Sequence, residues 1–415
     1  MSYFGDARDR FFDHRFGLFI HWGLYALPAW HEQILWRGEM SRADYEGLIH
    51  RFDPQAYNPE AWLDCAQQAG MSYVCFTTKH HDGFCMFDSK HTDYKITNTP
   101  YGRDVLEMLA EACRKRDIRL SLYYSLPDWH HPNYPNLGRH HEMFGPRPYE
   151  MADEDAYLDY VEKQIRELCT NYGELYQFFW DVNVAGFADP RFNELIRELQ
   201  PGILINDRGP SAGDYSTPER HVPDEMVFDS PTEACQSIGR ESWGYRAEED
   251  YYTHRFLMHS IDKILAMGGN YLLNVGPTAE GSFPFEAERS LERIGRWYKQ
   301  VQEAFIGTRP ASYLLRTTQG NRSRYDGLLL TRRRNTVYVH AADGLQANGM
   351  VLPGIRHAPS EAIVLNTGTT VETEVDTVPW RWTEQPCLRI KNIGADRLLE
   401  EPVVVRLEFP DEVVA

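Results

Sequence analysis

The sequence repeats one local pattern, an amphipathic helix that ends at a glycine or a charged residue and is followed by a short apolar strand. One unit begins at Asn58-Pro59, a helix N-cap followed by proline in the first helical position, and ends near Gly70, with residues 73–76 as its strand. Further units end in the apolar segments 118–124, 176–180 and 203–205. Helices that alternate with strands in this way predict a parallel sheet covered by helices.

A doubly wound open sheet and a closed (β/α)8 barrel both satisfy this pattern. No GxGxxG sequence follows a strand, which removes support for the dinucleotide-binding open sheet. Catalytic groups at the C-terminal ends of several strands are typical of the barrel. Polar residues do follow the apolar strands here: His21, His80, His81, Asp128, Asp181, Asp207 and Arg208. We therefore predict a (β/α)8-like (TIM-type) barrel over residues 1–306.

The pattern changes after residue 306, where Gly307-Thr308-Arg309-Pro310 interrupts the chain. The helical period disappears, and short strand-like runs follow at 328–331, 336–340, 362–365 and 403–409. This change predicts a second domain over residues 307–415, an antiparallel β-sandwich.

The composition excludes several classes of partner. With 43 Lys and Arg against 61 Asp and Glu, the net charge of −18 repels nucleic acid and anionic membranes. The seven cysteines are scattered without a CxxC pair, so neither a disulfide framework nor a zinc knuckle is expected. The chain shows no apolar N-terminal signal and no apolar run of about 18 residues, which favours a cytoplasmic protein without a membrane span. Homo-oligomer formation is left open.

Two carboxylates stand out as candidates for acid–base or nucleophilic chemistry. Asp181 ends the apolar strand 176–180, which would place its carboxylate at a barrel mouth beside large aromatic side chains. Glu219 follows Thr217-Pro218 in the loop after the next strand, and Glu225 and Glu233 are nearby alternatives. A retaining glycosidase needs two carboxyl groups about 5–5.5 Å apart, so this pair indicates a sugar hydrolase.

Three histidine pairs, His80-His81, His130-His131 and His140-His141, raise the question of a metal site. Adjacent strand residues point to opposite faces of a sheet, and HExxH is absent, so we expect no metal and no other cofactor. His80 and His81 are expected to hydrogen-bond to sugar hydroxyls, and the other two pairs, in a proline-rich loop, to be solvated.

Six segments together resemble one known family. They read RFGLFIHWG at 15–23, TKHHDGF at 78–84, LYQFFWD at 175–181, NDRG at 206–209, SWGY at 242–245 and GGNYLLNVGP at 268–277. In this order, over roughly residues 8–300, the chain resembles the α-L-fucosidases of glycoside hydrolase family 29. The tail looks like the C-terminal sandwich of that family.

The resemblance implies a retaining double displacement on fucosylated oligosaccharides or glycoconjugates, without a cofactor. It assigns the nucleophile to Asp181 and the acid/base to Glu219, with Glu233 as the alternative. It also implies sugar contacts from His21, His80, His81 and Arg208. The 6-deoxy sugar has a methyl group that needs an apolar wall, for which the candidates are Trp22, Trp36, Phe179 and Trp180.

The chain departs from the family pattern at three places. The usual Trp-Phe-Asp-Gly reads Phe179-Trp180-Asp181-Val182, and threonine replaces the tryptophan before Glu233. A Glu-Trp pair of the first loop reads Leu35-Trp36, so that Glu32 or Glu39 would have to replace the lost acid. These departures leave two other hypotheses: a carbohydrate-binding homologue without turnover, and an α-L-galactosidase with a polar pocket in place of the methyl wall.

Overall fold

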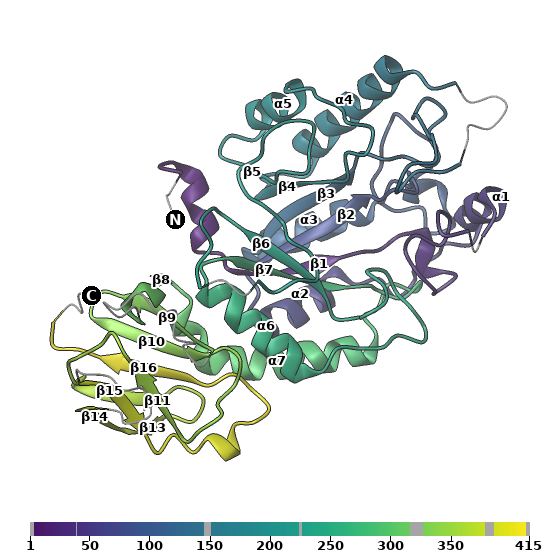
Figure 1. Ribbon diagram of the computed structural model, residues 1–415. Coiled ribbons are helices and arrows are strands. Elements are labelled where there is room, and N and C mark those ends of the chain that lie inside the picture. The colour runs from purple at the N-terminus through teal and green to yellow at the C-terminus, as the bar shows by residue number, and fades with distance from the viewer. Residues whose placement is uncertain are drawn as a thin grey trace.

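The structure is a computed structural model and describes residues 4–38, 40–144, 151–223, 226–315, 327–377 and 386–411. A curled sheet of parallel strands forms the larger part of the molecule (Figure 1). Seven strands follow one another across this sheet: β5 (Leu204–Ile205), β4 (Gln177–Asp181), β3 (Arg119–Ser125), β2 (Tyr73–Lys79), β1 (Phe16–Ile20), β7 (Asn270–Val275) and β6 (Glu233–Ser237). The barrel-like fold predicted from the sequence is confirmed.

The two edge strands, β5 and β6, form no ladder with each other. Residues 215–219 lie between them and are held by isolated parallel bridges, from Tyr215 to Asn206 on one side and from Glu219 to Cys235 on the other. This closing segment takes the place of an eighth strand. It brings Glu219 to the same barrel that carries Asp181.

Helices cover the outer face of the sheet. They are α2 (Pro59–Ala69), α3 (Val105–Arg116), α4 (Glu154–Asn171), α5 (Arg191–Leu199), α6 (His254–Ala266) and α7 (Phe285–Val301). The short α1 (Arg42–Glu46) lies apart from them, and its Tyr45 hydroxyl donates to Asp82 Oδ2, beyond the end of β2, at 2.5 Å. The ends of α2 are those predicted: the Asn58 side chain accepts a hydrogen bond from Glu60 N, and Gly70 ends the helix at φ 86°.

Side chains alternate between the two faces of each strand. Phe19, Cys75, Tyr123 and Phe179 belong to the apolar cluster that fills the barrel interior, whereas their strand neighbours pack beneath the helices. The same alternation decides which side chains reach the mouth of the barrel. His21 continues the inward face of β1, and Asp181 ends the inward face of β4.

The C-terminal part consists of two antiparallel sheets around their own apolar cluster. The larger contains β13 (Thr369–Thr370), β12 (Glu361–Val364), β16 (Val404–Glu408), β10 (Thr336–Ala341), β9 (Leu328–Arg333) and β8 (Arg309–Pro310). The smaller contains β11 (Gly349–Leu352), β15 (Cys387–Lys391) and β14 (Glu372–Asp376). The sandwich is confirmed, although the predicted runs correspond only to β9, β10, β12 and β16.

This C-terminal unit packs against α6 and α7 (Figure 1). His340 of β10 and Asp262 of α6 are both fully buried there, with Nδ1 2.8 Å from Oδ1. Trp297 of α7 donates its indole N–H to the carbonyl of Pro402 at 3.2 Å. Buried polar contacts therefore accompany the apolar packing between the two parts.

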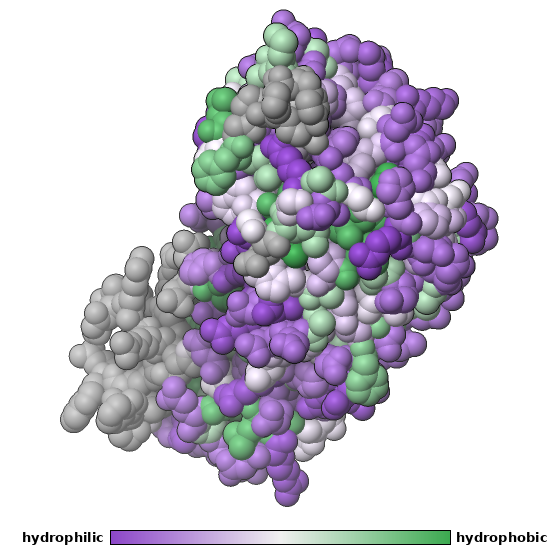
Figure 2. Space-filling view, turned by 90° about the vertical axis from the view of Figure 1, so that its right-hand side faces the viewer, coloured by the Kyte–Doolittle hydropathy of each residue, from purple (hydrophilic) through white to green (hydrophobic). Residues whose placement is uncertain are grey.

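The face of the molecule drawn in Figure 2 is mostly hydrophilic, with apolar residues scattered over it. Among the described residues, no helix combines the length and the apolar character that crossing a membrane requires.

Candidate active site

A cavity of about 440 Å³ opens at the C-terminal ends of the barrel strands. Its lining combines charged, imidazole and aromatic side chains: Phe19, His21, Glu32, Gln33, His80, His81, Tyr123, His141, Phe179, Asp181, Val182, Arg208, Glu219 and Trp243.

Asp181 lies in this cavity with both carboxylate oxygens engaged. The Tyr123 hydroxyl donates to Oδ2 at 2.6 Å, and Arg208 Nη1 donates to Oδ1 at 2.9 Å. His81 Nε2 stands 3.7 Å from Oδ2. Burial opposes ionisation, but Arg208, the Tyr123 hydrogen bond and His80 outweigh it and lower the pKa of Asp181. The residue is therefore an oriented, ionised carboxylate.

Glu219 faces the same cavity from the closing segment. Its Oε1 accepts a hydrogen bond from Arg208 Nη1 at 2.5 Å, and its side chain remains 44% exposed. Burial and the negative charge of Asp181 raise the pKa of Glu219, and Arg208 opposes them. The two carboxyl groups thus have pKa values shifted in opposite directions, the usual arrangement of an acid and a nucleophile.

Arg208 follows β5 and is held by the closing segment. Its Nε donates to the Thr217 hydroxyl at 2.6 Å, and its Nη2 donates to the Thr217 carbonyl at 2.5 Å. Its guanidinium carbon also lies 5.6 Å from the ring centroid of Phe179. The remaining nitrogen, Nη1, is thereby aimed at the two carboxylates.

Three histidines on the wall are held as neutral rings. Burial lowers the pKa of His21 to about 4 and lowers those of His80 and His81 well below their ordinary value. His21 Nδ1 lies 2.7 Å from Asn274 Oδ1, and His81 Nδ1 lies 2.5 Å from the Ser125 hydroxyl. His80 Nδ1 is buried without a partner in the free protein.

Glu32 is the acidic residue that the first loop contributes to the cavity. It accepts hydrogen bonds from the Ser242 hydroxyl at 2.7 Å and from the backbone N–H of Trp243 at 2.9 Å. Burial opposes its ionisation, but neighbouring histidines and the Ser242 bond lower its pKa to about 2. Leu35, which the motif comparison placed at the acid position, is buried in the apolar core, and Glu39 lies outside the described residues.

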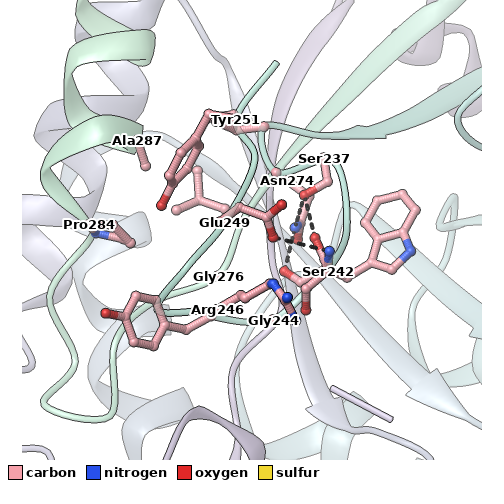
Figure 3. A pocket seen from close by; sticks show the side chains of 15 residues that line it. Ser237, Ser242, Gly244, Arg246, Glu249, Tyr251, Asn274, Gly276, Pro284 and Ala287 are labelled. Atoms are coloured by element: carbon pink, nitrogen blue, oxygen red, sulfur yellow. Dashed lines mark hydrogen bonds between the residues drawn. The ribbon is translucent and has the colours of Figure 1, made fainter. Parts of the chain in front are cut away.

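Trp243 forms an aromatic wall that the motif reasoning did not single out. Its ring centroid lies 5.3 Å from that of His21, and the guanidinium of Arg220 lies 4.7 Å from its ring centroid. Behind the loop that contains Ser242 and Trp243 is a second cavity, of about 270 Å³, where Glu249 faces Ser242 (Figure 3). Glu249 accepts the N–H of Ser242 at 3.1 Å. The loop is thus clamped by Glu32 on one side and Glu249 on the other.

The structure corrects two of the four predicted aromatic contacts. Trp22 packs among Phe52, Tyr57 and Trp62, and Trp180 donates its N–H to Asn193; neither ring lines the cavity. Strand alternation is the reason, because His21 and Phe179 point inward and their neighbours must point outward. Phe179 does line the cavity, and Trp36 lies behind it, stacked on His141 at 5.1 Å.

Glu233 is also placed differently from the expected loop position. It begins β6 and is fully buried in the barrel, where it accepts hydrogen bonds from the Tyr73 hydroxyl at 2.5 Å and from Gln177 Nε2 at 2.9 Å. Burial raises its pKa to about 7. It does not line the cavity that contains Asp181, and the other alternative, Glu225, lies outside the described residues.

The histidine pairs of the proline-rich loop are not simply solvated. His131 packs against Tyr160 with tilted rings whose centroids are 4.4 Å apart, His130 stacks on Tyr94 at 4.0 Å, and His141 lines the cavity. Within the described ranges, no cluster of three or more His, Cys, Asp or Glu side chains has a metal-binding arrangement.

Tyr123, Gln33 and His141 are further cavity residues that the sequence reasoning missed. Tyr123 had a usable signal, because it lies two residues before the end of β3 on the inward face. Gln33 and His141 lie in long loops, where no periodicity predicts side-chain direction. Gln33 Nε2 lies 3.2 Å from His141 Nδ1 and joins the two loops.

A (β/α)8-like barrel with two carboxyl groups in a cavity at its mouth is typical of glycoside hydrolases, and this is the class of the protein. More narrowly, the chain belongs to the α-L-fucosidase family, because the sequence model of that family matches residues 5–303.

Individual relatives agree with this assignment. Tissue α-L-fucosidase of Rattus norvegicus is 30% identical over 331 residues, which are 72% of this chain and 70% of the relative. The structure of α-L-fucosidase isoenzyme 1 from Paenibacillus thiaminolyticus has a TM-score of 0.85 at 34% identity and covers 98% of this chain and 100% of that one. A Bacteroides thetaiotaomicron enzyme, described as a trapped covalent intermediate with 2-fluoro-fucosyl fluoride, has a TM-score of 0.78 at 26% identity, over 98% of this chain and 97% of that one.

Proposed function

We propose that the protein is a retaining exo-α-L-fucosidase, with Asp181 as nucleophile and Glu219 as acid/base. One observation carries the proposal: Arg208 Nη1 lies 2.9 Å from Asp181 Oδ1 and 2.5 Å from Glu219 Oε1. The two oxygens are therefore no further apart than the sum of these distances. For this pair of oxygens, a separation so limited favours the arrangement of retaining glycosidases, roughly 5–5.5 Å, over that of inverting ones, roughly 6.5–9.5 Å.

In the first step, Asp181 attacks the anomeric carbon while Glu219 gives its proton to the leaving oxygen. The C1–O bond breaks, and an ester between Asp181 and the sugar forms. In the second step, Glu219 takes a proton from water, whose oxygen attacks C1 and releases the Asp181 carboxylate. The opposite pKa shifts of the two groups support these roles. The covalent intermediate described for the Bacteroides relative supports the same route.

The rest of the cavity supports recognition of a 6-deoxy sugar. His21, His80 and Glu32 bring polar atoms for the ring hydroxyls, while Phe179 and Trp243 offer apolar rings to a methyl group. Fucosylated oligosaccharides or glycoconjugates are the proposed substrates. Glu233 is assigned no catalytic role, since it lies outside this cavity.

Proton NMR of the first-formed sugar tests the proposal. Hydrolysis of 4-nitrophenyl α-L-fucoside should release α-L-fucose first, which then mutarotates, and Asp181→Asn should abolish this release. β-L-Fucose as the first product would contradict the retaining mechanism, and a folded wild-type protein without turnover would contradict the enzyme assignment.

A further inference from the structure

Backbone strain gathers at the catalytic cavity. Among the described residues, seven that are not glycine have a positive φ, and two of them, His141 at 65° and Val182 at 51°, line this cavity. A third, Arg220 at 49°, directly follows Glu219. Val182 is the only β-branched residue of the seven, and this is the side-chain type for which the conformation is least favourable.

The backbone around Val182 is held from both sides. Before it, the Asn206 side chain bonds both the N–H and the carbonyl of Trp180 at 2.8 Å, and Leu126 N donates to the Asp181 carbonyl at 3.0 Å. After it, Asn183 Oδ1 accepts from Phe187 N at 2.9 Å. A strained residue persists where its surroundings determine the conformation in this way.

Glycine would adopt this conformation without strain, so the presence of valine at position 182 requires another explanation. Val182 lines the same cavity as three charged residues, Asp181, Arg208 and Glu219. The leaving oxygen must come within hydrogen-bonding reach of Glu219. Of the described residues that line the cavity the leaving group must enter, Val182 is the only aliphatic one.

We propose that Val182 is a specificity-determining residue for the leaving group, which it contacts through its isopropyl group. The proposal rests on the proposed function, because it takes Glu219 as the acid that marks the leaving-group side. The ligand class is a leaving group with an apolar face, such as an aryl ring or the C–H face of a pyranose. A leaving group of one atom is too small to use this contact.

The test compares 4-nitrophenyl α-L-fucoside with α-L-fucosyl fluoride for the wild type, Val182→Gly and Val182→Ala. Loss of the contact should lower the ratio of the two kcat/KM values, aryl over fluoride, about tenfold in both variants. Val182→Gly should also raise the melting temperature by about 2 °C or more, because the strain is relieved. Arg334→Gly is the matched control: Arg334 is exposed at φ 55° in the turn between β9 and β10, so it should gain stability without changing the ratio.

An unchanged ratio in both Val182 variants would overturn the proposal, as would equal losses on both substrates, which indicate a structural role. A Val182→Gly protein no more stable than the wild type would remove the strain argument and overturn it too. Failure of the proposed function has a different signature, because the wild type would then turn over neither substrate.

Discussion

Asp181 and Glu219 accept hydrogen bonds from the same guanidinium nitrogen, Nη1 of Arg208, although one ends β4 and the other lies in the closing segment. The shared donor holds the two carboxyl groups at a short separation and offsets part of their repulsion. Burial raises and Arg208 lowers the pKa of both groups. The balance lowers the pKa of Asp181, whereas burial together with the charge of Asp181 raises the pKa of Glu219, so that one stays ionised and the other keeps its proton more readily.

Glu219→Ala should lower kcat/KM far more for substrates with poor leaving groups than for substrates with good ones. An alkyl or sugar leaving group needs the proton, whereas 4-nitrophenol leaves without it, so kcat/KM should fall about 10²–10⁴-fold for the former and much less for the latter. Azide should restore activity and yield α-L-fucosyl azide, because a small anion can attack the Asp181 ester without a base, and this second displacement restores the α configuration.

Glu233→Gln is the matched control, because it changes a buried glutamate outside the cavity. It should show no azide rescue. Rescue of the Glu233 variant and not of the Glu219 variant would transfer the acid/base role to Glu233.

The pH dependence should follow from the two carboxyl groups. Asp181 must be ionised to attack, and its pKa is below the ordinary 3.8; Glu219 must be protonated, and its pKa is above the ordinary 4.5. kcat/KM should therefore rise as the pH passes the first pKa and fall as it passes the second. Protonation of His21 and His141, with pKa values of about 4, adds to the acid limb.

Tyr123→Phe tests this account of the acid limb. It removes the hydroxyl that helps lower the Asp181 pKa, so the acid limb should move to higher pH while the alkaline limb stays. An acid limb that does not move would show that Tyr123 does not tune Asp181.

Glu233 should make the protein less stable at alkaline pH. Its pKa is about 7 in the folded protein against an ordinary 4.5, so its stabilising contribution is complete below 4.5 and is lost as the pH rises through 7. Between pH 4.5 and 8, the wild type should lose about 3 kcal/mol more unfolding free energy than Glu233→Gln does. Urea unfolding at both pH values measures the difference, with Glu174→Gln, an exposed glutamate, as control. Equal losses of unfolding free energy in the wild type and in Glu233→Gln would contradict the raised pKa of Glu233.

The enzyme should prefer a sugar with a methyl group at C5 over one with a hydroxymethyl group, but only to a limited extent. An apolar pocket rejects an added hydroxyl by about 10²-fold at most, so kcat/KM should favour aryl L-fucoside over aryl L-galactoside by tens to about a hundredfold. Trp243→Leu should shrink this preference, and Trp180→Phe, on the outer face of the sheet, should not. Equal wild-type rates on the two sugars would mean that no apolar methyl pocket exists.

Much of the barrel could be predicted because its signals are local. The helix ends at Asn58 and Gly70 and the apolar strands follow from capping and periodicity. β6 and the closing segment could not be found in this way, since β6 contains buried polar residues and the closing segment is held only by isolated bridges. The small antiparallel strands β11, β14 and β15 are short and half-exposed, which weakens their patterns.

Site residues at the ends of strands could be predicted from the sequence, whereas site residues in loops could not. Asp181 and His21 continue inward faces and line the cavity as expected, whereas Trp180, directly before Asp181, and Trp22, directly after His21, face outward. His141 and Gln33 reach the wall from loops whose directions depend on packing between distant segments. The identity of residue types in a motif therefore predicts less than the face on which each residue lies.

The most direct test of the account is covalent trapping with 2-fluoro-α-L-fucosyl fluoride. Fluorine at C2 slows hydrolysis of the glycosyl-enzyme ester, so the wild type should gain the mass of one 2-fluorofucosyl group, and peptide mapping should place it on Asp181. Asp181→Asn should remain unlabelled. Labelling of another carboxylate, or no labelling of an enzyme that turns over the aryl fucoside, would contradict the assignment of Asp181 as the nucleophile.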